Sequence, residues 1–259
     1  MLLENTVAVV TGMGPGMGQA IAKALAREGA DLVLASRSEA NIDDAVAAVE
    51  ALGRRALGVA TDISDGQACK SLVEKARQAF GRVDVLVNNA YHPGVYRKIE
   101  DADLEDWRPP FEVNVLGTMK LSQAVIPAMK DQGGGSIVMI NSMSMRTMVE
   151  SFGGYAASKA ALLVATQTLA LELGPYNIRV NSVVPGYIWG PNLKSYFEAQ
   201  ARELKTTAEA IYDGVAARTA LKHIPTSEEI AESVVFFASD RSKVITGQSL
   251  DVNGGHFFC

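Results

Sequence analysis

Two residues four positions apart, Tyr155 and Lys159, have the side chains needed for proton transfer. On a helix they lie on one face, one turn apart. A free tyrosine titrates near pH ~10, and a neighbouring ammonium favours the phenolate and lowers that pKa. A lowering of roughly three units needs about 4 kcal/mol, which a close cation in a partly dry site supplies. The spacing therefore indicates an acid/base group that works near neutrality, although by itself it also fits a solvated helix face.

A glycine-rich loop stands between the first expected strand, Val7–Val10, and the first expected helix, Gly18–Glu28. Glycines at such a turn let the backbone approach a pyrophosphate, and the helix N-terminus then offers free N–H groups and a partial positive charge. Because the loop follows a strand and precedes a helix, a dinucleotide site is favoured over a simple tight turn. The residues expected to bind the cofactor here are Gly12, Gly14, Gly16, Met17 and Gly18.

The second expected strand ends in Ser36 and Arg37, which bear on the choice of cofactor. A carboxylate at this place would bind the ribose 2′-hydroxyl of NAD. Ser36 is not acidic, whereas the guanidinium of Arg37 can grip a 2′-phosphate in a bidentate way. The pair therefore favours NADP(H), and NAD(H) stays possible if Arg37 is an ordinary surface arginine.

Polar residues also follow the third and fourth expected strands. Asp62 and Ile63 come after the third strand, where we expect them beside the adenine. Asn89 and Ala90 follow the fourth strand at the same edge of the sheet. The asparagine amide can bind the cofactor or tie strand ends together.

Short apolar runs alternate with helical patterns along the whole chain. Such runs, lacking in/out alternation, indicate strands buried on both faces. Their order predicts a single-domain α/β fold over residues 1–259, a Rossmann-like doubly wound parallel sheet of about seven strands with helices on both faces. Residues 191–225 contain only helical patterns and lie between the last two strands, so we expect a substrate lid there. The expected strands are Val7–Val10, Leu32–Ala35, Leu57–Ala60, Val83–Val87, Ile137–Ile140, Arg179–Val184 and Ser249–Val252.

The helical patterns come with expected ends. Asp65 and Ser227 are candidate N-caps, and we expect Gly29, Gly53, Gly81 and Gly174 to end helices. The expected helices are Gly18–Glu28, Ala40–Leu52, Gly66–Phe80, a stretch around Val115–Met129, Tyr155–Leu173, Glu228–Ala238 and, in the lid, Leu193–Leu204 and Ala208–Ala216.

Composition narrows the function classes. The net charge is −5 and no run is dense in Lys or Arg, so we expect neither a nucleic-acid partner nor binding to an anionic membrane. Two cysteines, Cys69 and Cys259, and three scattered histidines fit no disulfide framework and no metal site. The N-terminus shows no signal-peptide pattern, and the expected setting is cytoplasmic.

With these residues in view, the sequence resembles the classical short-chain dehydrogenase/reductase family over essentially its whole length. The matching positions, in order, are Thr11, Gly12, Gly16, Gly18, Asp62, Asn88, Asn89, Ala90, Asn114, Ser142, Tyr155, Lys159, Asn181, Pro185 and Gly186. No single motif among them is decisive, but their joint order and spacing are specific. The resemblance implies a nicotinamide cofactor, reversible oxidation of an alcohol to a carbonyl compound, and a homotetramer or homodimer.

The resemblance also implies roles for four catalytic residues. Tyr155 would exchange a proton with the substrate oxygen, and Lys159 would lower the pKa of the tyrosine and bind the nicotinamide ribose. Ser142 would hold the substrate oxygen, and Asn114 would anchor a water that links Lys159 to solvent. Pro185, Gly186 and Ile188 would contact the cofactor.

Two positions depart from the family pattern. Tyr91 follows Asn88-Asn89-Ala90 where the family usually has glycine, and Gly190 stands where a threonine often contacts the nicotinamide. With Tyr91, the residues Met143, Tyr187 and Trp189 are expected to line the substrate pocket. Together with Met145, Met148, Tyr196 and Phe197 they suggest an apolar wall, unless several of them form the core of the lid or a subunit interface.

The leading hypothesis is an NADP(H)-dependent oxidoreductase for a hydrophobic or cyclic alcohol or ketone. One alternative is an NAD-dependent sugar, polyol or hydroxy-acid dehydrogenase, or a 3-oxoacyl thioester reductase, of the same fold. His92 and Arg146 would then hold a polar or anionic substrate. A third hypothesis, a nucleotide-sensing scaffold, conflicts with the complete set of catalytic residue types.

Overall fold

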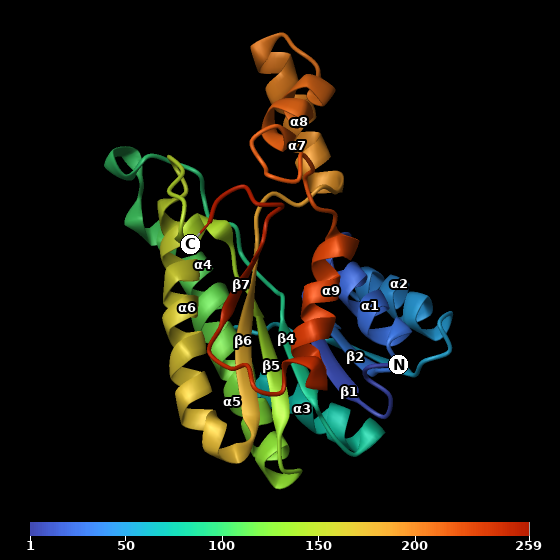
Figure 1. Ribbon diagram of the computed structural model, residues 1–259. Helices are drawn as coiled ribbons and strands as arrows, with labels where there is room; N and C mark the ends of the chain where they lie inside the picture. The colour runs from blue at the N-terminus through green and yellow to red at the C-terminus, as the bar shows by residue number, and fades with distance from the viewer. Residues whose placement is uncertain (259) are drawn as a thin grey trace.

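Seven strands form one parallel sheet at the centre of the protein, in the order β3-β2-β1-β4-β5-β6-β7 (Figure 1). The computed structural model describes residues 1–258, so Cys259 lies outside the described residues. All seven expected strands are confirmed within a few residues. Their bounds are β1 (Val7–Thr11), β2 (Asp31–Ser36), β3 (Ala56–Ala60), β4 (Val85–Asn88), β5 (Gly135–Ile140), β6 (Ile178–Pro185) and β7 (Ser249–Val252).

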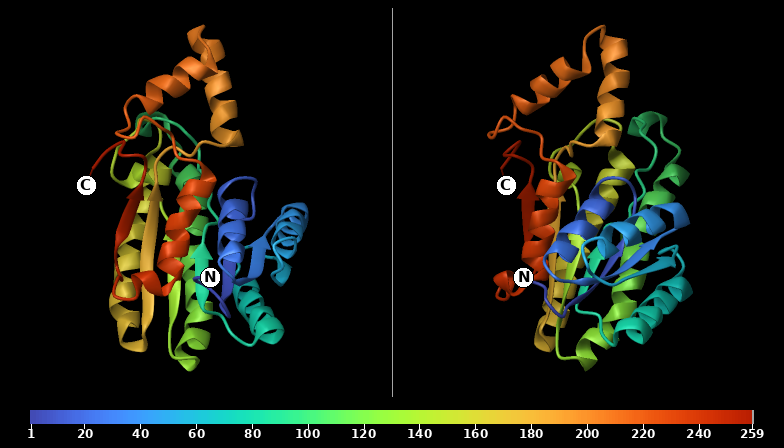
Figure 2. Two further views of the ribbon diagram at one scale, coloured as in Figure 1. Left: turned by 45° about the vertical axis from the view of Figure 1, so that its right-hand side comes forward. Right: turned by 90° about the vertical axis from the view of Figure 1, so that its right-hand side faces the viewer.

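Helices cover both faces of the sheet, as the two turned views show (Figure 2). One face packs against α1, α2 and α9, and the other against α3, α5 and α6. The doubly wound α/β fold is therefore confirmed. The bounds of the longer helices are α1 (Met17–Arg27), α2 (Glu39–Glu50), α3 (Gly66–Phe80), α5 (Thr118–Asp131), α6 (Gly153–Leu173), α7 (Pro191–Leu204), α8 (Ala208–Ala216) and α9 (Ser227–Ala238).

The continuous apolar runs of the sequence follow from this two-faced burial. In β1, Ala8 and Val10 enter the core under α1, whereas Val7 and Val9 enter the core on the opposite face. All four side chains are at most 3% exposed. A strand that buries both of its faces has no polar side to alternate with.

The strand order reverses between β1 and β4, which are neighbours in the sheet although β2 and β3 separate them in the chain. The glycine-rich loop leaves the carboxyl end of β1, and Asn89 leaves the carboxyl end of β4. In open α/β sheets, ligands bind in the crevice at this switch point. The topology therefore brings the predicted cofactor residues to one edge.

The predicted N-cap Asp65 and the predicted helix end at Gly81 are confirmed, whereas the predicted N-cap Ser227 is wrong. Asp65 caps α3 by accepting from Gln67 N and Ala68 N, and Gly81 ends the same helix with a left-handed φ of 79°. Ser227, however, is the first residue of α9 and not its cap. The cap is Thr226, because its extended backbone lets it form a reciprocal capping box with Glu229.

Gly174 ends α6 as its C-cap, as predicted, but without a left-handed turn. Its φ is −50°, and the chain continues into a short 3-10 helix, Gly174–Tyr176. Asn177, which follows this 3-10 helix, adopts the left-handed conformation, with a φ of 58°. Asparagine tolerates that conformation better than other non-glycine residues.

The helix expected around Val115–Met129 begins differently from the prediction. A short helix, α4 (Arg108–Phe111), runs into a π-helical turn, Glu112–Gly117, before α5 begins at Thr118. Single π-helical turns often occur at functional sites, since they change the direction of backbone groups. Asn114 lies inside this turn and is 1% exposed.

The chain between β6 and α9 forms a helical insertion, α7 and α8, which extends away from the body of the protein beyond the carboxyl ends of the strands (Figures 1 and 2). It has its own small core, built around Phe197, Val215 and Ile224. Both helices fall within residues 191–225, the range for which the sequence predicts a lid.

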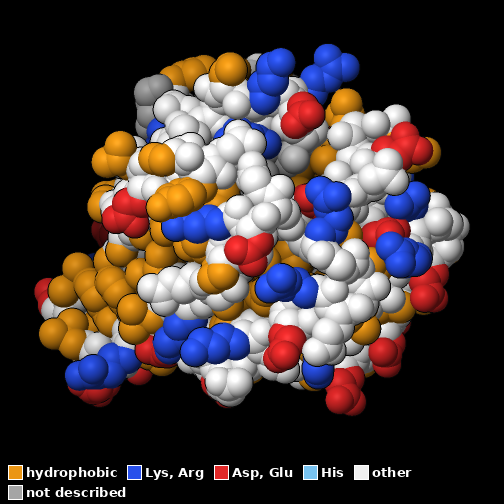
Figure 3. Space-filling model, turned by 90° about the horizontal axis from the view of Figure 1, so that it is seen from below, with side chains coloured by type: hydrophobic (Ala, Val, Ile, Leu, Met, Phe, Trp, Pro, Cys, Tyr) orange, Lys and Arg blue, Asp and Glu red, His pale blue; other side chains and the backbone are white. Residues whose placement is uncertain are grey.

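Several large apolar side chains stay exposed on the outer helices, including Val164 at 63% and Leu171 at 82% on α6. Seen from below, hydrophobic side chains gather toward one side of the molecule, while charged side chains of both signs are spread over the rest (Figure 3). Within residues 1–258, no helix is long and apolar enough to cross a membrane.

The glycine-rich loop offers a matched pair of substitutions that test this packing. A Cβ at Gly18 would stand 2.1 Å from the Gly12 carbonyl oxygen, whereas a Cβ at Gly14 would meet nothing within 4 Å. We expect Gly18→Ala to lower the free energy of unfolding by more than about 2 kcal/mol, and Gly14→Ala by less than about 0.5 kcal/mol. Urea unfolding of both variants measures this, and equal stability would show that the α1 turn is not tightly packed.

Candidate active site

The glycine-rich loop makes a tight turn against the end of β4. Gly12 has a φ of 77°, and a Cβ there would stand 2.7 Å from Ala90 Cα. Gly14 N donates to Gly12 O at 2.8 Å, which closes the turn. Glycine is therefore required at position 12 by both conformation and space, and the open space beside Gly14 is the room that a ligand needs.

The N-terminus of α1 emerges directly from this loop. Its cap residue, Gly16, has a φ of 124° and provides no side-chain cap, and the first turn holds no acidic residue. The free N–H groups and the positive end of the helix dipole therefore stay available for an anion. Backbone around Gly16, Met17 and Gly18 fits the pyrophosphate of a dinucleotide.

Asn89 acts mainly as a structural tie between β1 and β4. Its Nδ2 donates to Thr11 O and Gly12 O, both at 2.9 Å. Thr11 Oγ1 accepts in turn from the backbone N–H groups of Asn89 and Ala90. Of the two roles that the sequence left open for this asparagine, the structure shows the tie, which fixes the glycine-rich loop.

Ser36 and Arg37 lie at the carboxyl end of β2, the strand that pairs with β1 next to the glycine-rich loop. Ser36 ends β2, and Arg37 is exposed beside it. Within the described residues, the Arg37 guanidinium makes no ion pair with a carboxylate within 4.0 Å, so its charge is available to a ligand. It is near enough to Asp62 to help lower the pKa of that carboxyl, after the hydrogen bonds from Ser64.

The other predicted cofactor residues differ in what they can offer. The Ile63 side chain is 5% exposed and belongs to the core, so only its backbone can face a ligand. Pro185 ends β6, and Gly186 follows it, where a Cβ would stand 2.8 Å from Asn253 Cβ. Ile188 is partly buried against the core on the α1 face.

Tyr155, Ser142 and Lys159 converge between the end of β5 and the start of α6. Lys159 is 3% exposed, and its Nζ donates to Ile140 O at 2.8 Å. The same Nζ lies 5.8 Å from the centre of the Tyr155 ring. Ser142 follows β5; its hydroxyl accepts a hydrogen bond from Ser144 Oγ at 3.1 Å and is near enough to Tyr155 to influence the pKa of that phenol. The four-residue spacing therefore does bring tyrosine and lysine to one buried face.

Burial shifts the pKa values of both Lys159 and Tyr155. It lowers the pKa of Lys159 to about 7, and it raises the pKa of Tyr155 above its usual value, while the nearby Ser142 side chain opposes that rise. The expected lowering of the tyrosine pKa by Lys159 is not found. The reason is that a lysine with a pKa near neutrality is only partly charged and is a weak cation for its neighbour.

Asn114 connects the π-helical turn with two other segments. Its Oδ1 accepts from His92 N at 2.7 Å, and its Nδ2 donates to His92 O at 3.0 Å and to Ser158 Oγ at 2.9 Å. Both N–H groups of the amide are thus used, and one acceptor position of Oδ1 remains. Asn114 fixes the loop that carries Tyr91 to the helix that carries Tyr155.

The four expected substrate residues divide into two groups. Tyr91 lies with its ring edge-on to Tyr155, at 6.4 Å between centres, and Met143 directly follows Ser142, with its Sδ near Gly186. Trp189 instead packs against Tyr212 at 4.6 Å in the core of the insertion. Tyr187 packs against the same core and stacks on His256 at 5.8 Å. For Trp189 and for the fully buried Phe197, the lid-core interpretation is the correct one.

Arg146 is not a free anion-binding residue. Its guanidinium pairs with Asp251 at 3.2 Å, and both side chains are about one-fifth exposed, at 19% and 21%. His92 is also engaged, since its Nδ1 accepts from Gly94 N at 3.0 Å. The alternative in which these two residues hold an anionic substrate is therefore wrong for Arg146.

Two aromatic residues beside the site were missed by the sequence reasoning. Tyr96 and Phe152 stack at 4.5 Å between ring centres. The backbone bond from Arg97 N to Ser151 O at 3.0 Å holds their segments together. Neither residue belongs to a motif, and 56 positions separate them in the chain, so only tertiary structure reveals the pair.

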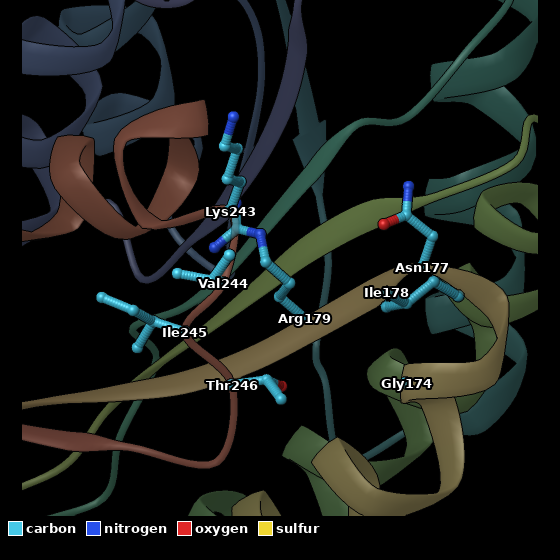
Figure 4. Close-up of a pocket in the computed structure, with 8 residues that line it drawn as sticks. All are labelled: Gly174, Asn177, Ile178, Arg179, Lys243, Val244, Ile245 and Thr246. Carbon is cyan, nitrogen blue, oxygen red and sulfur yellow. The ribbon is translucent and has the colours of Figure 1, made fainter.

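A separate hollow of about 180 Å³ lies at the opposite, amino-terminal end of β6 (Figure 4). Arg179 lies in its wall, but its guanidinium donates to Phe237 O, Ser239 O and Ser242 Oγ. The arginine therefore caps the end of α9 and is not free for a ligand. Within residues 1–258 there is also no group of three or more His, Cys, Asp or Glu residues that could hold a metal ion.

Known proteins share this sequence and architecture. A family model described as enoyl-(acyl carrier protein) reductase matches residues 12–256. Dehydrogenase/reductase SDR family member 4 of Bos taurus is 36% identical over 253 residues, covering 98% of this chain and 88% of the relative. L-sorbose reductase of Gluconobacter frateurii, solved with NADPH and L-sorbose, is 32% identical with a TM-score of 0.92, covering 99% of this chain and 98% of that one. Carveol dehydrogenase of Mycobacterium avium, solved with NAD, is 27% identical with a TM-score of 0.92, covering 98% of each chain.

The chain belongs to the short-chain dehydrogenase/reductase family. It is an oxidoreductase of the kind that uses a nicotinamide cofactor, as the family match and the solved relatives support. The relatives include proteins solved with NAD and with NADPH, so similarity alone does not choose between the two cofactors.

The buried lysine predicts an unusual dependence of stability on pH. Because its pKa falls from an ordinary value of 10.5 to about 7 on folding, the unfolded chain binds the proton more tightly between these limits. Stability contributed by this group therefore rises with pH from 7 toward 10.5. We expect Lys159→Met to raise the free energy of unfolding at pH 7 by about 2–4 kcal/mol, with a gain that shrinks as the pH rises. Urea unfolding between pH 6 and 9.5 tests this, and a gain that does not depend on pH would contradict it.

Proposed function

We propose that this protein is an NADP(H)-dependent oxidoreductase that interconverts a secondary alcohol and a ketone on a hydrophobic or cyclic small molecule. The observation that carries the proposal is the convergence of Tyr155, Ser142 and the buried Lys159 at the carboxyl edge of the sheet. The open glycine-rich loop lies at the same edge.

The residues that would hold the cofactor follow from their places. Backbone at Gly14, Gly16, Met17 and Gly18 would bind the pyrophosphate at the start of α1. Arg37, with Ser36 beside it, would bind the 2′-phosphate. Asp62, Ile63 and Ala90 would border the adenine half, and Pro185, Gly186 and Ile188 the nicotinamide half. When bound, the nicotinamide supplies or accepts the hydride.

Tyr155 is the proposed general acid/base. Its raised pKa keeps the phenol protonated, which is the form that ketone reduction needs. In that direction the phenol proton passes to the carbonyl oxygen while Ser142 donates a hydrogen bond to the same oxygen. In the reverse direction, the phenolate takes the proton of the alcohol.

Lys159 would return a proton to the Tyr155 phenolate after ketone reduction. A group with a pKa of about 7 exchanges protons readily at neutrality. We propose that it passes a proton toward Tyr155 and binds the nicotinamide ribose. A water on the remaining acceptor position of Asn114 would link it to solvent.

The insertion that contains α7 and α8 is the proposed lid, residues 191–225. It leaves the sheet at the carboxyl end of β6, next to Gly186, and it carries its own small core. A unit with a separate core can move over the site without disturbing the sheet.

We also propose that the protein assembles as a homotetramer or homodimer through the outer faces of α5 and α6. The support is the family membership together with the exposed Val164 and Leu171 on α6. Exposed apolar side chains two turns apart on one face of a helix are typical of such interfaces.

Replacing the proposed acid tests the mechanism directly. We expect Tyr155→Phe to reduce kcat by about 100- to 10,000-fold, because the phenyl ring has no proton to transfer. The dissociation constant for NADPH, measured by fluorescence titration, should change little, because the hydroxyl is not among the proposed phosphate ligands. Unchanged turnover of any ketone substrate in this variant would disprove the assigned role.

A charge reversal tests the cofactor assignment. We expect Arg37→Asp to shift the ratio of kcat/KM values from NADPH toward NADH by about 10- to 100-fold, the worth of a charge-assisted bond to phosphate. Lys243→Asp makes the same charge change at an exposed position at the other end of the molecule and serves as the control. Equal or tighter binding of NADH by the unmodified protein would overturn the NADP proposal and favour the NAD-dependent alternative.

A further inference from the structure

Exposed tyrosines are concentrated at the proposed active site. Four tyrosines are strongly exposed: Tyr91 at 54%, Tyr96 at 56%, Tyr196 at 56% and Tyr176 at 47%. Burial raises the pKa of Tyr155, and Tyr91 and Tyr96 are near enough to add to that rise; burial likewise raises the pKa of Tyr96, with smaller contributions from Tyr91 and Tyr196. Only Tyr176 lies elsewhere, under Lys130 at 3.5 Å.

The three tyrosines near the site come from separate parts of the fold. Tyr91 and Tyr96 belong to the loop after β4, and Tyr196 belongs to α7 of the insertion. Phe152, just before α6, completes the group by stacking on Tyr96. We call Tyr91, Tyr96, Tyr196 and Phe152 the aromatic collar.

The loop that carries Tyr91 and Tyr96 is held in place. Asn114 fixes it at His92 with bonds of 2.7 and 3.0 Å, and Arg97 N donates to Ser151 O further along. The two rings are therefore presented by a fixed backbone. Their position does not depend on the conformation of the insertion, which brings only Tyr196.

Protein contacts do not account for the exposure of these rings. Within the described residues, none of the three collar tyrosine hydroxyls makes a hydrogen bond to a protein group. Exposed apolar surface that gathers at one place usually marks a binding site. Tyr91 also stands where the family usually has glycine, so this chain adds a large ring next to the proposed acid.

The charged groups nearby do not favour a polar substrate. Arg146 pairs with Asp251, and His92 accepts from Gly94 N. Tyr91 already meets the Tyr155 ring edge-on, with planes 67° apart, which is a favoured aromatic geometry.

We infer that the aromatic collar selects ketones and alcohols that carry a planar apolar ring next to the reacting carbon. The substrate ring would lie against Tyr91 and the Tyr96–Phe152 stack, and Tyr196 would cover it from the insertion. This inference rests on the proposed function and narrows its substrate class, which the alcohol/ketone chemistry alone leaves open.

Two ketones of equal carbon count, propiophenone and dibutyl ketone, separate aromatic recognition from general hydrophobicity. With NADPH, we expect the unmodified protein to reduce propiophenone with the higher kcat/KM. Tyr91→Leu, Tyr96→Leu and Tyr196→Leu should each lower the ratio of the two kcat/KM values by about 3- to 10-fold, since an aromatic pair is worth about 0.5–1.5 kcal/mol beyond its buried area. Tyr91→Phe and Tyr96→Phe should keep the ratio, because the ring is retained.

Tyr176→Leu is the matched control, because it removes an equally exposed tyrosine far from the site and should leave the ratio unchanged. A binding measurement makes the test independent of turnover. In the Tyr155→Phe background with NADPH bound, calorimetry should show weaker binding of propiophenone, by the same 3- to 10-fold, when Tyr91→Leu is added.

The outcomes distinguish this inference from the proposed function. If both ketones are reduced but no leucine variant changes the ratio or the binding of propiophenone, the collar inference is overturned and the proposed function stands. If a keto sugar such as fructose is strongly preferred over both ketones, the collar inference is likewise overturned. If no alcohol or ketone is turned over but propiophenone binds in a Tyr91-dependent way, the proposed function fails and the collar stands as a binding site.

Discussion

The ammonium of Lys159 is the group around which the rest of the site is arranged. It is buried under the sheet edge, and its one protein acceptor is the carbonyl of Ile140, the last residue of β5. Removing an ammonium from water costs free energy. Lys159 stays buried because the core on that face packs α6 against the sheet. The same burial brings its pKa to about 7, where a lysine both gives and takes protons. Burial of Lys159 therefore both lowers the stability of the fold and gives the lysine the pKa that suits its proposed role in proton transfer.

A parallel sheet makes this arrangement possible, because it gathers the ends of several strands at one edge. Hydrogen bonds from side chains then join those ends: Asn89 joins β4 to the glycine-rich loop, and Asn114 joins the loop after β4 to α6. Each asparagine side chain forms hydrogen bonds with backbone groups of another segment. Those backbone groups have no partner within helices or strands. These ties place the proposed phosphate site and the proposed proton-transfer site at a fixed separation, which catalysis by positioning requires.

Much of this was predictable from local signals. The strands were found because burial on both faces forces continuous apolar runs, and Asp65 and Gly81 were placed at helix ends by capping chemistry. Errors arose where a neighbouring residue competed for the same role, as Thr226 did with Ser227. The π-helical turn at Glu112–Gly117 also escaped prediction, because no residue type signals it. Trp189 packs against the core of the insertion, one of the two places that the sequence left open, because an aromatic residue is equally suited to a pocket wall and to a core.

The sequence by itself determined the order of the strands and helices, the loop that suits a phosphate, and the candidates for proton transfer, because periodicity and spacing are local properties of the chain. Tertiary structure alone decided the state and surroundings of those residues. It showed that burial raises the pKa of Tyr155 and lowers that of Lys159, that Arg146 is paired with Asp251, and that the ring of Tyr91 meets the ring of Tyr155. Desolvation and contact depend on what the whole fold packs around a side chain, and no spacing along the chain encodes them directly.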